Sequence, residues 1–239
     1  MRVIGITGTG GAGKTTLAAN IASCLALDGI RTLLIDADLY FPNVGTHFGT
    51  RSRYTIHDFL GNTHMDVEWL LHPVHGVKGL YLILGDESRI PGPSVSYKPL
   101  GSLIELVREN FGAIIIDFPS GLPIMTHSIV EHLDYQVLVI QPEAVPRQDT
   151  IPWVKELVLK YSRLGTGKPL IVLNKHFLSR KEELRIESYI ADELGYPVLV
   201  SIPHDRRFIE SLHEGMPLCL LGDFPESVAI LGAEIAALL

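Results

Sequence analysis

The glycine-rich stretch GTGGAGKTT, residues 8–16, constrains the fold of this chain more than any other feature. It follows the apolar run RVIGIT, precedes the helical pattern LAANIASCLAL and matches G-x-x-x-x-G-K-[ST]. Glycines let several backbone N–H groups converge on one centre, and the N-terminus of the next helix adds N–H groups and partial positive charge. The motif therefore predicts a strand, a phosphate-binding loop and a helix, in preference to a plain tight turn.

Short apolar runs alternate with helical patterns along the rest of the chain. Strands are expected at 2–7, 31–36, 80–84, 113–117, 135–140, 169–174 and 197–202. Most of these runs are continuously apolar, which indicates strands buried on both faces of a parallel sheet. The alternation predicts a single doubly wound three-layer α/β domain over residues 1–239, with a mostly parallel sheet. Residues 41–79 and 85–98 are less regular and are expected to form loops with short helices.

Composition limits the classes of function. The formal net charge of -7 argues against a standing role on nucleic acid, and 46% hydrophobic residues indicate a globular chain. A cytoplasmic location is expected, because the N-terminus carries no leader and no apolar run is long enough to span a membrane. Two cysteines, Cys24 and Cys219, are too few for a disulfide framework, and Cys24 is interpreted as a small core residue.

Two carboxylates extend the phosphate-loop prediction. Asp36 and Asp117 each end an expected strand, and the ends of parallel strands meet at the edge where the first loop also lies. Either one alone is often a helix cap. Together with Lys14 on the β/γ-phosphates and the Thr15 hydroxyl on Mg²⁺, they predict a Mg²⁺-nucleotide site.

With these motifs the chain resembles the MinD/ParA group of P-loop ATPases, in the class that also holds the nitrogenase iron protein. The resemblance covers nearly the whole length. Its segments are GTGGAGKTT, DADLYFPNVGTHFG, IIIDFPSG, QPEAVPRQD, VLNK and SIPHDRRFIESLHEGMPL.

The resemblance implies a role for each matching residue. Lys14 and Asp38 would be catalytic, with Asp38 orienting or activating the attacking water. Thr15, Asp36 and Asp117 would surround Mg²⁺, and Gly121 would sense the γ-phosphate through its backbone. The loop residues expected to bind the nucleotide are Gly10, Gly11, Ala12, Gly13, Lys14, Thr15 and Thr16.

The segment NKHF, residues 174–177, indicates which nucleotide base is preferred. It begins like the guanine-reading pattern Asn-Lys-x-Asp but has Phe177 where the carboxylate would accept hydrogen bonds from guanine, which favours adenine. By resemblance, Asn174, Pro203 and Asp205 are expected to contact the adenine. A strand-end turn is an equally open interpretation of Asn174.

Two positions depart from the family pattern. Thr9 occupies the place of a signature lysine that, in many members, reaches the phosphates of a partner subunit. Slow basal hydrolysis and weak ATP-driven dimerisation are therefore expected, with Arg147 as a candidate substitute cation or a plain surface arginine. The C-terminal FPESVAILGAEIAALL lacks Lys and Arg, so it is expected to be a packed helix with no direct membrane binding.

These observations favour an ATP-binding switch that uses ATP/ADP and Mg²⁺, hydrolyses ATP slowly, and recruits or positions a protein partner. Whether it acts as a homodimer stays open at this point. One alternative is an ATPase of metallocentre maturation, supported only by the histidines of the segment His57, His64, His72 and His75. Another is a module that binds ATP without turnover, which the neutral Thr9 favours. The partner itself is not predicted.

Overall fold

The strands of the chain form one eight-stranded sheet, in the order β3-β4-β2-β5-β1-β6-β7-β8. The structure is a computed structural model that describes residues 1–89, 91–92, 96–121, 126–164 and 169–239. Every neighbouring pair is parallel except β3 and β4. The strands are β1 Arg2–Gly8, β2 Thr32–Asp36, β3 His72–Pro73, β4 Leu80–Ile83, β5 Ala113–Asp117, β6 Tyr135–Ile140, β7 Leu170–His176 and β8 Val198–Pro203.

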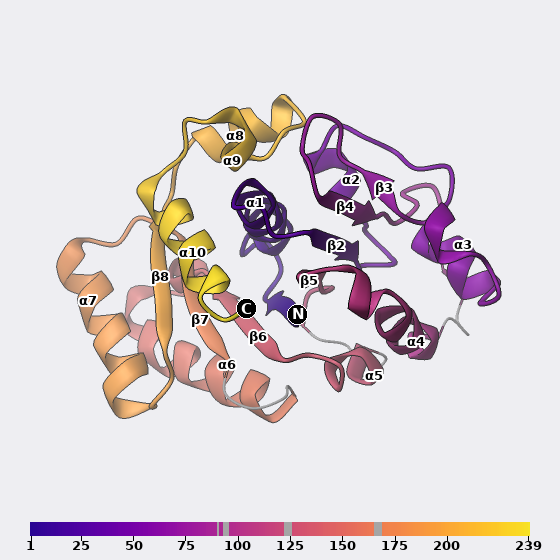
Figure 1. Cartoon of the computed structure of the whole chain (residues 1–239). Helices are drawn as coiled ribbons and strands as arrows, with labels where there is room; N and C mark the ends of the chain where they lie inside the picture. Colours follow the sequence, from indigo (N-terminus) through magenta and orange to yellow (C-terminus); the bar gives the residue numbers. More distant parts are fainter. Residues whose placement is uncertain (90, 93–95, 122–125, 165–168) are drawn as a thin grey trace.

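Helices cover both faces of this sheet (Figure 1). The apolar residues of α1 and α10 pack on one face, and those of α4 and α6 pack on the other. Central strands such as β2 and β5 are buried along their whole length, which explains their continuously apolar sequences. The helices are α1 Lys14–Leu27, α2 Val44–His47, α3 Ile56–Gly61, α4 Lys98–Val107, α5 His127–Val130, α6 Thr150–Leu164, α7 Arg180–Ser188, α8 Arg207–His213, α9 Leu218–Leu221 and α10 Glu226–Ala236.

The structure confirms the predicted doubly wound, mostly parallel three-layer fold and all seven expected strands. The sequence did not predict β3, because two residues are too short to show a strand pattern. The expected packed C-terminal helix is α10, whose Leu231 and Ile235 lie in the core beside α1. Within the described residues, no helix is both long and apolar enough to cross a membrane.

The two cysteines differ from their prediction. Cys24 on α1 and Cys219 on α9 form a disulfide, although 195 residues separate them in the chain. Cys24 does line a small buried cluster, with Val228 of α10. Cys24 is therefore a small core residue, as predicted, but the disulfide was not predicted, because sequence spacing does not show that α9 returns to the side of α1.

Candidate functional site

Three strands end side by side at the edge of the sheet where the glycine-rich loop begins. Asp36 at the end of β2 is in register with Asp117 at the end of β5, and Asp117 is also in register with Ile6 of β1. The loop leaves β1 at this edge, and α1 starts at Lys14. The sheet thus brings together the loop and both carboxylates, as the sequence predicted.

The loop requires glycine at two positions, each because of a positive φ and a close neighbour. Gly8 has φ +147°, and a Cβ there would collide with the Val139 carbonyl oxygen of β6. Gly13 has φ +91°, and a Cβ there would lie 2.5 Å from Asn174 Nδ2 of β7. The backbone therefore packs closely on two neighbouring strands, which only residues without a side chain allow.

Lys14 lies buried at the first position of α1. Its ammonium donates to the Ser120 hydroxyl at 2.8 Å and to the Thr9 carbonyl at 3.2 Å. Burial lowers the pKa of Lys14, while the charges of Asp117 and Asp38 act in the opposite direction. Ser120 was not predicted as a site residue; its position in IIIDFPSG beside Gly121 was the signal available.

Asp117 is buried and carries an unsatisfied oxygen. Its Oδ1 has no hydrogen-bond partner among the residues that the structure describes. Burial raises the pKa of Asp117 to about 7, against a hydrogen bond from the Thr15 side chain and the charge of Lys14, which lower it. An orphaned buried carboxylate oxygen is costly and marks a place for a ligand.

Asp36 differs from Asp117 because backbone groups already hold both of its oxygens. Oδ1 accepts from Asp38 N at 3.1 Å, and Oδ2 accepts from Asn43 N and Val44 N, each at 2.9 Å. Burial and the neighbouring Asp117 raise the pKa of Asp36 well above its ordinary value. Asp36 thus fixes the loop that carries Asp38, and its role near a metal stays a prediction.

The donor set of Thr15 and Asp117 fits Mg²⁺. This ion prefers hard oxygen ligands and is usually held by one or two carboxylates together with substrate phosphates. The unpartnered Asp117 Oδ1 offers such an oxygen next to the phosphate loop.

Asp38 and Gly121 lie on the two segments that border the loop. Asp38 Oδ1 accepts from the backbone N–H groups of Tyr40 at 3.2 Å and Phe41 at 3.0 Å, which fixes its turn. Gly121 has φ +82°, and its N–H donates to the Gly8 carbonyl at 3.2 Å. That contact ties the segment after β5 to the start of the phosphate loop.

A small cavity of about 200 Å³ adjoins the loop on the side of β7 and β8. It contains the predicted residues Asn174 and Asp205, and apolar side chains of α8 form much of its wall. Its lining residues are Gly13, Thr16, Asn174, Lys175, His204, Asp205, Phe208, Ile209 and Leu212.

The predicted base contacts have different surroundings. Asn174 Nδ2 donates to the Ala12 carbonyl at 2.7 Å, whereas its buried Oδ1 has no partner among the described residues. The Asp205 carboxylate is held by the Arg207 guanidinium, at 2.7 Å from Nη2. Pro203 ends β8 and is exposed. Asn174 and Asp205 line the cavity, whereas Pro203 is not among its lining residues, and the contacts of all three with a base stay predictions.

Phe177, at the place of a guanine-reading carboxylate, stacks on His204. Their ring centroids are 4.6 Å apart, with an interplanar angle of 20°. Phe177 therefore fills this position with an apolar ring that has no hydrogen-bond acceptor.

The sequence also gave no indication of a role for His47. Its Nδ1 lies 3.0 Å from the Asn43 carbonyl, so that nitrogen carries the proton and Nε2 accepts from the Thr16 hydroxyl at 3.1 Å. Burial lowers the pKa of His47, which favours this neutral form. The pair connects the phosphate loop with the segment held by Asp36.

The candidate substitute cation and two histidines of the metallocentre alternative have partners away from the phosphate loop. Arg147 forms an ion pair with Glu182 of α7 at 3.2 Å and is largely exposed. His57 contacts the Leu39 carbonyl at 3.0 Å, and His72 contacts the Thr50 hydroxyl at 2.9 Å. Within the described residues, no three His, Cys, Asp or Glu side chains gather as a metal site.

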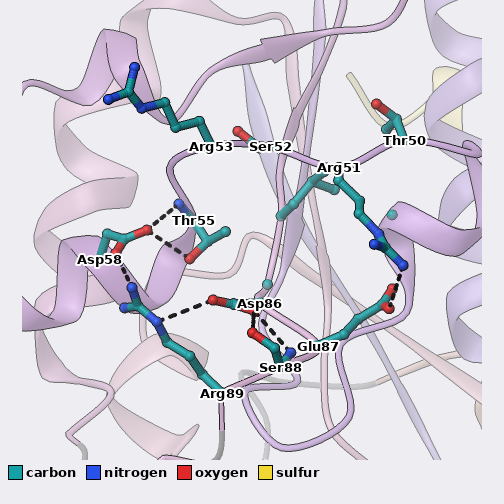
Figure 2. Close-up of a pocket in the computed structure, with 13 residues that line it drawn as sticks. Thr50, Arg51, Ser52, Arg53, Thr55, Asp58, Asp86, Glu87, Ser88 and Arg89 are labelled. Carbon is teal, nitrogen blue, oxygen red and sulfur yellow. Dashed lines mark hydrogen bonds and ion pairs between the residues drawn. The ribbon is translucent and has the colours of Figure 1, made fainter.

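A second, larger cavity of about 450 Å³ lies between residues 50–58, which lead into α3, and the loop after β4 (Figure 2). Arg89 lies 2.7 Å from Asp58 and 3.1 Å from Asp86, and Arg51 lies 4.0 Å from Glu87. We call it the arginine cavity. These arginines and carboxylates neutralise one another.

Together, the sheet, the glycine-rich loop and the two strand-end carboxylates define a P-loop nucleotide-binding α/β protein. The family model of the CobQ/CobB/MinD/ParA nucleotide binding domain matches residues 3–218. The chain therefore belongs to this family.

Relatives and solved structures agree with that assignment. A putative septum site-determining protein MinD of Chlorella vulgaris is 30% identical over 226 residues, covering 92% of this chain and 78% of the relative. The cell division ATPase MinD of Pyrococcus furiosus has a TM-score of 0.79 at 25% identity, over 100% of this chain and 99% of the other. MinD of Pyrococcus horikoshii, solved in complex with Mg-ADP, has a TM-score of 0.79 at 23% identity, over 99% and 96%.

Proposed function

We propose that this chain is an adenine-nucleotide switch that binds Mg-ATP, hydrolyses it slowly and couples its nucleotide state to a protein partner. The observation that carries the proposal is the buried Asp117 carboxylate with its unsatisfied Oδ1. Asp117 is in register with Ile6 of β1, and the phosphate loop that leads to Lys14 follows β1. Membership of a nucleotide-binding family and the Mg-ADP complex of the Pyrococcus horikoshii relative support it.

Each residue of the site has a defined task in this proposal. Lys14 leaves Ser120 and pairs with the β/γ-phosphates, and the N–H groups of residues 10–16 surround them. Thr15 and Asp117 would hold Mg²⁺, which neutralises phosphate charge when bound. Asp38, on a turn fixed by its own Oδ1, orients the attacking water.

Slow turnover follows from the charge around the loop. A cation delivered to a transferring phosphoryl group accelerates hydrolysis by about 10³–10⁵ in other nucleotide hydrolases. Thr9 supplies no such charge, and Arg147 is engaged with Glu182. We therefore expect a low basal rate for the isolated protein and weak ATP-driven dimerisation.

Adenine selectivity rests on Phe177 and Asn174. The Phe177 side chain offers no carboxylate acceptor for guanine N1 and N2, while the orphaned Asn174 Oδ1 suits an adenine amino group. Calorimetric titration with Mg-ATP and Mg-GTP tests the proposal. We expect tighter binding of Mg-ATP; equal or tighter binding of Mg-GTP would contradict the base assignment, and binding of neither would contradict the function.

A further inference from the structure

Lys175 has an unusual backbone for a lysine. Its φ is +56°, and among the described residues it is the one non-glycine with a positive φ. A side chain in the left-handed region costs about 1–2 kcal/mol, so such residues persist where the surrounding structure uses them.

The cause of this conformation is a bulge at the end of β7. The register with β8 shifts between Asn174 and His176, which leaves Lys175 as the extra residue. Bulges next to functional sites redirect a side chain. At the end of β7, the side chain that the bulge redirects is the cationic one of Lys175.

The Lys175 side chain ends on the phosphate loop. Its Nζ donates to the Gly11 carbonyl at 3.1 Å, and Asn174 Nδ2 donates to the next carbonyl, that of Ala12, at 2.7 Å. Two successive residues of β7 thus hold two successive carbonyls of the loop. Because C=O and N–H point in opposite directions in a planar trans peptide, these contacts fix the orientation of the peptide N–H groups of Ala12 and Gly13.

Lys175 also adds charge where the loop itself has little. Lys14 is the loop's own cation, and it lies buried between Ser120 and the carbonyl of Thr9. Lys175 lines the small cavity together with Gly13, whereas Ser120, the partner of Lys14, lies beside Gly10 at another point of the loop.

From these contacts we propose that Lys175 is a positioning residue of the phosphate loop, which holds the loop in its anion-binding form and supplies the site's second positive charge from within the same chain. The inference rests on the proposed nucleotide binding. It assigns a function to the bulge and to the strained φ, which packing of β7 alone does not require.

The test uses three substitutions of Lys175 in the full chain and one control. Lys175→Asn removes the charge but tolerates a positive φ, Lys175→Gly removes both charge and strain, and Lys175→Arg keeps the charge. Lys181→Asn removes an exposed charge on α7 as the control. Affinity for Mg-ADP is measured by calorimetry, and the thermal midpoint is measured without nucleotide.

We expect Lys175→Asn and Lys175→Gly to weaken Mg-ADP binding about ten- to a hundred-fold, the range of one hydrogen bond to a charged group. Lys175→Arg should recover most of the affinity, and Lys181→Asn should leave it unchanged. The thermal midpoint of Lys175→Gly should equal or exceed that of the wild type, because glycine adopts a positive φ without strain. A purely structural lysine would instead lose stability and affinity together.

Wild-type affinity in Lys175→Asn and Lys175→Gly would overturn the inference, as would equal losses in Lys175→Arg and Lys175→Asn. A wild-type protein that binds no Mg-ADP would overturn the proposed function itself. The two failures are distinguished because the first requires a wild type that binds.

Discussion

The phosphate-loop site and the arginine cavity are both polar, yet their charges are arranged in opposite ways. The arginine cavity has the larger volume, but Arg89 and Arg51 are paired there with Asp58, Asp86 and Glu87 (Figure 2). At the phosphate loop, Asp117 keeps an unpartnered buried oxygen. An unsatisfied buried carboxylate oxygen, and not cavity volume, therefore distinguishes the phosphate-loop site from the arginine cavity.

The largest effect should follow removal of the loop cation. Lys14→Ala should weaken Mg-ATP binding more than about 100-fold, because a buried ammonium contributes charge-assisted contacts to phosphate. Calorimetry measures the loss, with Lys78→Ala, an exposed lysine of the segment after β3, as the matched control. Retained affinity in Lys14→Ala would remove the main distinction between the phosphate-loop site and the arginine cavity.

Asp38→Asn should separate binding from turnover. Asparagine keeps an Oδ1 acceptor for the N–H groups of Tyr40 and Phe41, so the turn remains, but it cannot act as a base. We expect Mg-ATP affinity within about twofold of the wild type and a turnover lower by roughly 10²-fold, at the low end of general-base effects. Phosphate release under saturating Mg-ATP measures this. An unchanged rate would show that Asp38 does not position the water.

Removal of the Asp117 charge should stabilise the nucleotide-free protein. Because burial raises the pKa of Asp117 to about 7, the folded state holds this proton more tightly than the unfolded state. The stability from this group is full below the ordinary aspartate range near pH 4 and is lost as the pH rises through about 7. Asp117→Asn, which is neutral at every pH, should therefore raise the unfolding free energy by roughly 1–3 kcal/mol at pH 8 and by less at pH 5.

Thermal unfolding at both pH values measures this difference, and Asp86→Asn in the arginine cavity is the matched control. Asp86 accepts from Ser88 and Arg89, and its pKa is lowered, chiefly by the Ser88 hydroxyl. Its replacement should lower stability at pH 8. If both substitutions changed the unfolding free energy at pH 8 in the same direction, the contrast between the two regions would be wrong.

The contrast also separates what the sequence could predict from what it could not. The phosphate loop, Asp36 and Asp117 were predictable, because their spacing and the ends of parallel strands bring them to one edge. Ser120, His47 and Lys175 act through single hydrogen bonds between distant segments, and no local pattern encodes such contacts. The Cys24–Cys219 disulfide depends in the same way on where α9 returns in space.

The smallest effect should come from Arg89→Ala in the arginine cavity. About half of the Arg89 side chain is exposed, so its ion pairs with Asp58 and Asp86 are screened by water and together contribute at most about 1 kcal/mol. Asp58 keeps its hydrogen bonds from the backbone and hydroxyl of Thr55 at the start of α3, so that helix remains capped. We expect a small decrease in the thermal midpoint and an unchanged affinity for Mg-ATP, measured by thermal unfolding and calorimetry in the same buffer. A loss of nucleotide affinity would show that the two regions are coupled. Its path would be His57, which joins the Leu39 carbonyl beside Asp38 to the backbone of Asp86.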